Sequence, residues 1–184
     1  MRKLRKRADN EKLICEKLIE MIEQKPFHEI KVVEFREYCG ISRATFYTYF
    51  DSIYSVLQKI EDDFFSGLMA VSGEVKEFTR ANTLSSAKYI QNNFRVFRAL
   101  CGTNGEPAFQ ARLVSHSKRR FNTLFTRYTT KLTAAEMSLI IEFLANGQVS
   151  LLKWWAFHDD EISLNDFLKI SRTLLNGVSE LFIS

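Results

Sequence analysis

The sequence predicts an all-α protein, and two observations lead to this. Apolar residues recur at spacings of three and four along most of the chain, which is the repeat of helices that bury one side. The 184 residues include only seven glycines and two prolines, so few residues would interrupt a helix. Hydrophobic residues make up 46% and charged residues 26% of the chain, as is typical of an ordered globular protein.

Four helices are expected in the N-terminal part, over residues 9–24, 32–38, 42–49 and from 51 or 52 onward. Pro26 ends the first, because proline cannot continue the hydrogen-bond ladder of a helix. Gly40 is a plausible left-handed terminator of the second, and Ser42 is a typical N-cap for the third. Asp51 or Ser52 would cap the longer fourth helix.

Four more helices are expected in the remainder, over residues 86–100, 109–128, 134–157 and 164–182. The polar segment 79–86 is the best boundary between domains, and the turn CGTNGEP at 101–107 separates two helices. We therefore predict a three-helix domain at 1–50, with a basic arm at 1–8. A connecting helix at 51–78 would join it to a second helical domain at 79–184.

The stretch ISRATFYTYF, residues 41–50, combines four aromatic rings with an arginine and small hydroxyl side chains. On a helix, Phe46 and Phe50 share one face and can be buried, while Ala44, Thr45 and Thr48 point the opposite way. Small side chains let a helix approach base edges closely in the major groove of DNA. A short helix, a glycine turn and such a second helix form a helix-turn-helix. The alternative is a dense core fragment with an ordinary polar surface.

Residues 40–50 resemble the recognition-helix signature of the TetR/AcrR family of bacterial transcriptional regulators. Apolar residues upstream stand at that family's apolar positions: Ile14, Leu18, Ile22, Phe27, Ile30 and Phe35. Residues 99–109 and 143–155 resemble the regulatory domain of a Gram-positive subgroup, which includes regulators similar to the activator of dihydroxyacetone-kinase operons. The resemblance implies a helix-turn-helix domain and an all-α regulatory domain that dimerises through its last two long helices.

The resemblance also implies DNA-binding residues. Those expected to face bases are Arg43, Ala44 and Thr48, and those expected to contact phosphates are Thr45, Tyr47 and Tyr49. Ser42 and Lys31 are also expected to be DNA-binding residues. Three residues depart from the family pattern: Lys31 replaces a capping Thr or Ser, Val33 a polar or basic residue, and Ile53 a phosphate-binding lysine. The basic arm with Arg5, Lys6 and Arg7 would compensate by tracking phosphates or entering the minor groove; a solvated tail is the alternative.

Residues 134–157 are apolar on nearly all sides, which indicates a helix buried on two sides. We predict a homodimer, and the residues expected at its interface are Leu144, Gly147, Leu151, Trp154, Leu174 and Val178. The alternative is a purely intramolecular core. Trp154 and Trp155 are about 100° apart on a helix and cannot face the same surface. We expect Trp155 in the core and Trp154 at the dimer interface or in a pocket wall.

A ligand pocket would need aromatic or basic side chains in the second domain, and no residue is assigned to it. The aromatic candidates are Tyr89, Phe94, Phe97, Phe121, Phe125 and Tyr128, and the candidates for binding an anionic effector are Arg95, Arg98 and Arg112. Ordinary core and surface roles are the alternatives. The acidic run that follows His158 has no metal-binding spacing, and no catalytic motif is present, so we expect no metal, no cofactor and no enzyme.

The expected function is a homodimeric regulator, most often a repressor in this family, that binds an inverted-repeat operator and is released by an effector. Two alternatives stay open: an activator or regulator controlled by a protein partner, and a non-transcriptional DNA-bound adaptor. Three cysteines with no CxxC spacing predict reduced thiols, and the chain has no apolar run of about 20 residues that could span a membrane. We therefore expect a bacterial cytoplasmic protein.

Overall fold

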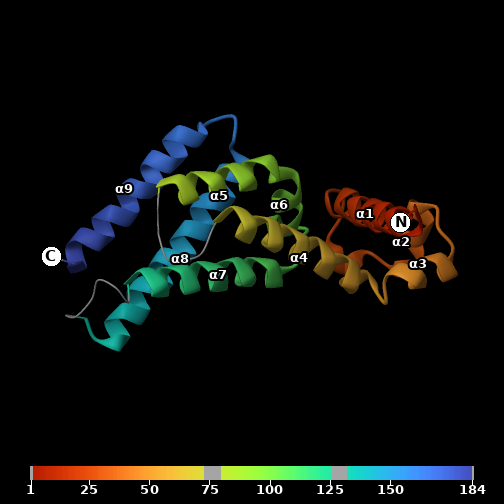
Figure 1. The fold of residues 1–184 in the computed structure, drawn as a ribbon, viewed down its shortest axis with the longest axis horizontal. Coiled ribbons are helices and arrows are strands. Elements are labelled where there is room, and N and C mark those ends of the chain that lie inside the picture. The colour runs from red at the N-terminus through yellow and green to blue at the C-terminus, as the bar shows by residue number, and fades with distance from the viewer. Residues whose placement is uncertain (1, 73–79, 126–131, 184) are drawn as a thin grey trace. The chain divides into compact units, whose positions relative to one another are not determined.

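The computed structural model describes residues 2–72, 80–125 and 132–183, and within these every regular element is a helix (Figure 1). In chain order they are α1 (Arg2–Ile22), the 3-10 turn η1 (Phe27–Glu29), α2 (Val32–Cys39), α3 (Arg43–Tyr49), α4 (Ile53–Ser72), α5 (Arg80–Asn92), α6 (Phe94–Cys101), α7 (Pro107–Phe125), α8 (Ala134–Phe157) and α9 (Leu164–Ile183). The all-α prediction is therefore confirmed.

The chain forms two compact units. The first consists of Met1–Gly67 and Ala99–Glu106, and the second of Leu68–Arg98 and Pro107–Ser184. The first unit thus contains α1, α2, α3, most of α4, and the turn after α6. The predicted domains divide the chain differently and stay a prediction; the boundary after residue 78 falls outside the described residues.

The core of the first unit is built from the apolar stripe of α1. Leu18 and Ile22 are fully buried, and so are Phe35 of α2 and Phe46 of α3. The rings of Phe35 and Phe46 meet edge to face, with 6.1 Å between their centroids, which is a favoured geometry for an aromatic pair. The long helix α1 and the short helices α2 and α3 are thereby held together by the side chains that the apolar spacing marks as buried.

The turn between α6 and α7 completes the first unit through its backbone and one side chain. The amide N–H of Phe27 donates to the carbonyl oxygen of Asn104 at 2.8 Å, and the side-chain amide of Asn104 donates to the carbonyl oxygen of Ile22 at 2.9 Å. A side chain at Gly105 would place its Cβ 2.7 Å from the carbonyl oxygen of Ala99, so this tight turn requires glycine.

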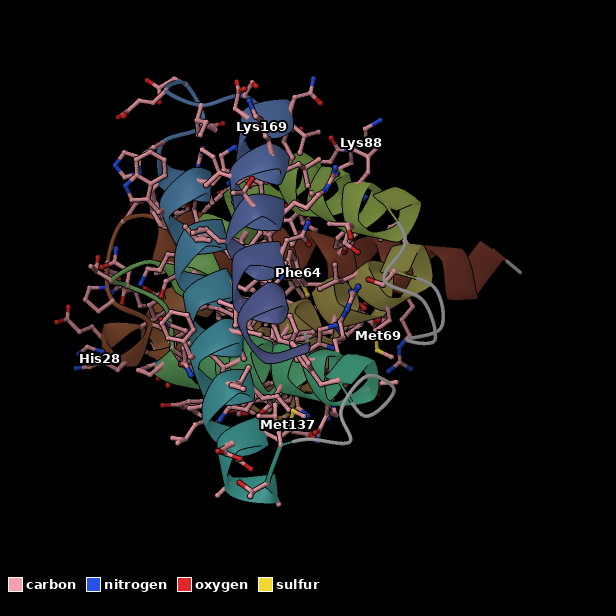
Figure 2. All side chains as sticks on the ribbon, turned by 90° about the vertical axis from the view of Figure 1, so that its left-hand side faces the viewer. His28, Phe64, Met69, Lys88, Met137 and Lys169 are labelled. Carbon is pink, nitrogen blue, oxygen red and sulfur yellow. The ribbon has the colours of Figure 1, made fainter. Side chains whose placement is uncertain are left out.

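The second unit is centred on α8. Among the described helices, the packing of α7 against α8 is the most extensive. Figure 2 shows this unit with α9, which carries Lys169, and α8, which carries Met137, toward the viewer. Trp155 is fully buried between Phe94, whose ring it meets edge to face at 4.8 Å, and Phe167, on which it stacks at 4.2 Å. The prediction that Trp155 lies in the core is confirmed.

One helix prediction and one boundary prediction need correction in this part of the chain. The single helix expected over 86–100 is two helices, α5 and α6, because the chain turns at Asn93, whose side-chain amide donates to the carbonyl oxygen of Tyr89. The polar segment 79–86, expected to be a boundary, belongs from Arg80 onward to α5. By contrast, α8 has the predicted bounds, and a capping box between Thr133 and Glu136 starts it.

Candidate nucleic-acid interface

The turn between α2 and α3 is set by Gly40. Its backbone is left-handed, with φ 65° and ψ 30°, and its N–H donates to the carbonyl oxygens of Arg36 and Glu37 at the end of α2. A residue with a side chain would be strained in this conformation. Ser42 then starts α3, since its hydroxyl accepts the backbone N–H of Thr45 at 3.0 Å. The predicted glycine terminator and serine cap are both present.

The same kind of capping starts α4. The hydroxyl of Ser52 accepts the backbone N–H of Ser55, and the hydroxyl of Ser55 accepts that of Ser52, each at 3.1 Å. Of the two predicted caps, Asp51 and Ser52, the structure therefore uses Ser52. This reciprocal pair fixes the start of the helix that follows α3.

One side of α3 is fully buried and the other is exposed. Phe46 has no exposed surface and Phe50 is 7% exposed, whereas Arg43, Ala44 and Thr48 are all exposed. Ser42 and Tyr47 are also exposed, and Thr45 and Tyr49 are half-buried. The outward side of this helix therefore carries the small and hydroxyl side chains that the sequence places there.

Hydrogen bonds inside α3 limit what its hydroxyl groups can offer. The hydroxyl of Thr48 donates to the carbonyl oxygen of Ala44 at 2.8 Å, and the hydroxyls of Ser42 and Thr45 are joined at 2.8 Å. With its only hydrogen used inside the helix, Thr48 can present an approaching base with a methyl group and acceptor lone pairs. The exposed surface of α3 is thus rich in methyl groups.

Arg43 and Tyr49 are oriented by neighbouring side chains. The guanidinium of Arg43 lies over the ring of Tyr47, 5.7 Å from its centroid, one turn further along the helix. The phenolic oxygen of Tyr49 accepts a hydrogen bond of 2.7 Å from the side-chain amide of Asn10 on α1. Since that oxygen acts as acceptor toward Asn10, the hydroxyl hydrogen of Tyr49 can be donated elsewhere. The sequence gives no local signal for Asn10, because the contact joins residues 39 positions apart.

Lys31 is exposed and stands at the N-cap of α2, where its side chain makes no capping hydrogen bond. Lysine has no acceptor atom, so it cannot satisfy the first amide groups of the helix. The positive end of the helix dipole lies beside this positive side chain. Glu34 in the first turn offsets part of this charge, although Lys25 already binds its carboxylate at 2.5 Å.

The basic N-terminal segment is helical, which corrects the expectation of an arm outside the first helix. Helix α1 starts at Arg2, because this stretch contains good helix formers and no glycine or proline. Arg7 is exposed and pairs with Glu11 one turn later at 3.1 Å. The side chains of Arg5 and Lys6 lie outside the described part of the chain, so their predicted contacts are untested.

A second exposed surface lies on α8 and α9, and we call it the apolar face. Its large exposed side chains, with their exposed fractions, are Leu139 (72%), Phe143 (69%), Trp154 (47%), Phe157 (44%), Ile170 (47%) and Leu174 (52%). On α8 these residues follow helical spacing with Gly147 and Leu151 between them. Figure 2 shows the two helices side by side.

Some of the residues predicted for the dimer interface lie on the apolar face, and others lie in the core. Leu144 is 5% exposed and packs in the core with Phe121 and Ile140, so it does not belong to the apolar face. Val178 is half-buried and packs against the same core. Gly147 and Leu151 are half-buried on the face, and Trp154 and Leu174 are exposed there. Leu139 and Phe143, which are exposed on the apolar face, are not among the predicted residues.

The second unit also contains a cavity of about 580 Å³, lined by residues of α4, α5, α7, α8 and α9. Of the predicted aromatic candidates, Phe121 and Phe125 line it. Phe94 and Phe97 are instead in the core, against Trp155 and Phe109. Tyr89 is half-buried and is not part of the lining, and Tyr128 lies outside the described residues.

None of the three predicted arginines lines the cavity in the described part of the chain. Arg98 donates instead to the carbonyl oxygen of Ala156 and pairs with Asp159, which joins α6 to the end of α8. Arg95 is exposed and Arg112 is half-buried outside the lining. The basic residues that do line the cavity are His116, Arg120 and Arg172, which sequence reasoning did not select.

A helix-turn-helix with an exposed second helix, joined to a second helical unit, is an arrangement found in DNA-binding transcriptional regulators. The comparisons agree with this class. A TetR-family model described as "Transcriptional regulator C-terminal region" matches residues 81–177, more than half of the chain. The chain therefore belongs to the TetR family of transcriptional regulators. Members of this family bind DNA, act as dimers and are generally not enzymes.

Solved structures show the same fold. One is titled "TetR transcriptional regulator from Streptococcus agalactiae 2603V"; it is 23% identical, with a TM-score of 0.74, over 95% of this chain and 97% of the other. Another is titled "Dihydroxyacetone kinase operon activator DhaS"; it is 17% identical, with a TM-score of 0.65, over 95% of this chain and 98% of the other. No curated protein sequence matches this chain. Within the described residues, no helix is both long and apolar enough to cross a membrane.

Proposed function

We propose that the protein is a homodimeric repressor that binds an inverted-repeat operator in the bacterial cytoplasm and is released by an effector. The observation that carries the DNA-binding part is α3 itself. Its buried side is anchored by Phe46, and its outward side is free of bulky aliphatic chains and includes an exposed arginine. Such a helix can enter the major groove, where arginine binds guanine in two places and methyl groups contact thymine.

The remaining side chains suit contacts to phosphates. The hydroxyl of Tyr49 keeps a hydrogen to donate, and Lys31 brings a positive charge to the N-terminus of α2. A phosphate placed there would meet both the charge of the lysine and the positive end of the helix dipole. Arg7, with Arg5 and Lys6, would supply further charge from the first turns of α1.

Arg43→Ala tests the assignment of base contacts. We expect specific binding to weaken by about 1–3 kcal/mol and the preference at one base pair per half-site to relax. Arg119→Ala is the matched control, because it removes an equal charge from an exposed position on α7 in the other unit. Site selection from random DNA, followed by footprinting, measures both variants. Protection of a single unrepeated site by a monomer would refute the proposal, since half-sites should lie about 34–36 Å apart or a multiple of this.

We propose that a second copy of the chain covers the apolar face. A surface on which several large aromatic and aliphatic side chains are about half exposed or more is unusual for a free monomer. Gly147 lies in the middle of the stripe on α8, and a Cβ added there would have open space before it, with no described atom within 4 Å beyond its chain neighbours and the adjacent helix backbone. The protomer therefore gives no packing reason for this glycine, whereas a partner helix that approaches closely does.

Gly147→Ala separates the two explanations, because its effects on protomer and dimer should have opposite signs. Alanine favours a helix by about 1 kcal/mol over glycine, so the isolated protomer should gain stability. The added methyl group would hold the partner helix away, so the dimer should dissociate more easily. Ser138→Ala is the control, because Ser138 lies on the opposite side of α8 from Gly147. Analytical ultracentrifugation and melts at low protein concentration measure both quantities; an unchanged dimer would contradict this interface.

Activation is the alternative for the sign of regulation. One similar structure is that of a dihydroxyacetone kinase operon activator, so this fold also serves activators. A reporter gene behind the operator, with and without the protein, decides between them. Repression requires reporter output to rise when the gene for this protein is deleted.

A further inference from the structure

The cavity of the second unit is of a size that encloses small organic molecules, at about 580 Å³. Much of its wall is apolar. Phe121 and Phe125 of α7, Phe167 and Leu175 of α9 and Leu113 of α7 are among the side chains that line it. A ligand with a sizeable apolar body would therefore bury much of that body against rings and branched chains.

The ionisable side chains that line the cavity, within the described residues, are all basic. His116 and Arg120 are one turn apart on α7, and both are half-buried at the cavity. Arg172 of α9 also lines it and is exposed, so the wall reaches solvent at that point. Among the described residues that line the cavity there is no aspartate or glutamate. A cationic ligand would thus meet only like charge, whereas an anion would meet two guanidinium groups.

The environment of His116 is consistent with this positive field. Burial, together with the charges of Arg120 and Arg119, lowers the pKa of His116. Burial also lowers the pKa of Arg120, because the charged guanidinium has lost part of its hydration. A ligand carboxylate beside these groups would be attracted by the positive charge of Arg120.

We infer that the cavity binds an amphipathic organic anion, with its carboxylate at Arg120 and its apolar body between the phenylalanines of α7 and α9. The neutral ring of His116 can donate or accept one hydrogen bond at the same end of the ligand. The step from this ligand to an effector rests on the proposed function; the binding itself does not.

The test uses three probes with the same tail and different head groups: decanoate, decanol and decylamine. Isothermal titration calorimetry on the full chain measures the affinity for each. We expect decanoate to bind about tenfold or more tightly than decanol, as charge-assisted hydrogen bonds permit. Arg120→Gln should abolish this preference but retain decanol binding. Arg119→Gln is the matched control, since Arg119 is exposed and is not part of the lining, and it should keep the preference.

Equal affinity for decanoate and decanol, tighter binding of decylamine, or no binding of any probe would overturn the inference. So would equal losses in the Arg119 and Arg120 variants. The comparison of probes on the unaltered protein decides the matter even where a variant fails to fold. Operator binding is measured separately on ligand-free protein. Failure there would refute the proposed function and leave the assignment of the cavity standing, whereas decanoate binding that leaves operator affinity unchanged would refute only its role as effector.

Discussion

Trp154 and Trp155 are neighbours on α8, but Trp155 is buried in the core and Trp154 is exposed on the apolar face. Substituting each one in turn therefore tests the core and the apolar face separately. Trp155 has no exposed surface, contacts Phe94 and Phe167 with its ring, and donates from Nε1 to the carbonyl oxygen of Ile162 at 3.3 Å. Truncation to alanine leaves a cavity between two rings and removes a buried hydrogen bond. Replacing a buried tryptophan costs about 3–5 kcal/mol. For a chain of this size that corresponds to a fall in melting temperature of about 6–20 °C.

Trp154→Ala is the partner experiment. This side chain is 47% exposed, and its ring stacks on that of His158 at 4.3 Å. Surface substitutions usually change stability by no more than about 0.5 kcal/mol, so the melting temperature of the protomer should change by about 2 °C or less. On the apolar face, however, the loss of a large ring should raise the dissociation constant of the dimer.

Circular dichroism melts at several protein concentrations separate the two effects, because dimerisation makes the melting temperature depend on concentration. Analytical ultracentrifugation then gives the dimer dissociation constant of each variant. The reasoning is refuted if both variants lose stability equally at low concentration. It is also refuted if Trp154→Ala leaves the dimer unchanged.

Three further outcomes are expected. Gly40→Ala should destabilise the protein by about 1–2 kcal/mol because φ is 65° there, as a thermal melt would record. Asn10→Ala and Tyr49→Phe should each weaken binding to all DNA sequences alike by about 0.5–1.5 kcal/mol, and the double variant should lose no more than one single variant if the pair acts as a unit. The pKa of His116 is lowered in the folded protein, so this residue contributes stability at pH values above its ordinary pKa of 6.5, and that stability is lost as the pH falls. Urea titrations between neutral and acidic pH should therefore show that His116→Gln loses less free energy of unfolding on acidification than the unaltered protein does.

The helix-turn-helix could be predicted closely because its signals are local. Gly40, Ser42 and the pair Phe46 and Phe50 fix the turn, the cap and the buried side within eleven consecutive residues. The break at Asn93 was missed, since no glycine or proline marks it. It depends on a side chain bonding to the carbonyl oxygen of Tyr89, which competes with continuation of the helix.

The apolar face and the cavity were harder to predict for a different reason. Helix α8 is apolar on nearly all sides, so its spacing alone cannot say which apolar side faces α7. Leu144 faces the core and Phe143 is exposed, although both are large and apolar. The cavity wall comes from five helices, and the basic residues at it are chosen by packing rather than by a motif.

The segment Ala99–Glu106 has a consequence for how this regulator can be recombined. The first unit is discontinuous in the gene, because the chain leaves it after Gly67 and returns at Ala99. A chimera that joins only residues 1–67 to a foreign regulatory domain would remove Asn104. The carbonyl oxygen of Ile22 and the N–H of Phe27 would then lose their hydrogen-bond partner. Exchange of operator specificity between relatives therefore has to carry two separate pieces of sequence, or be confined to substitutions within α3 itself.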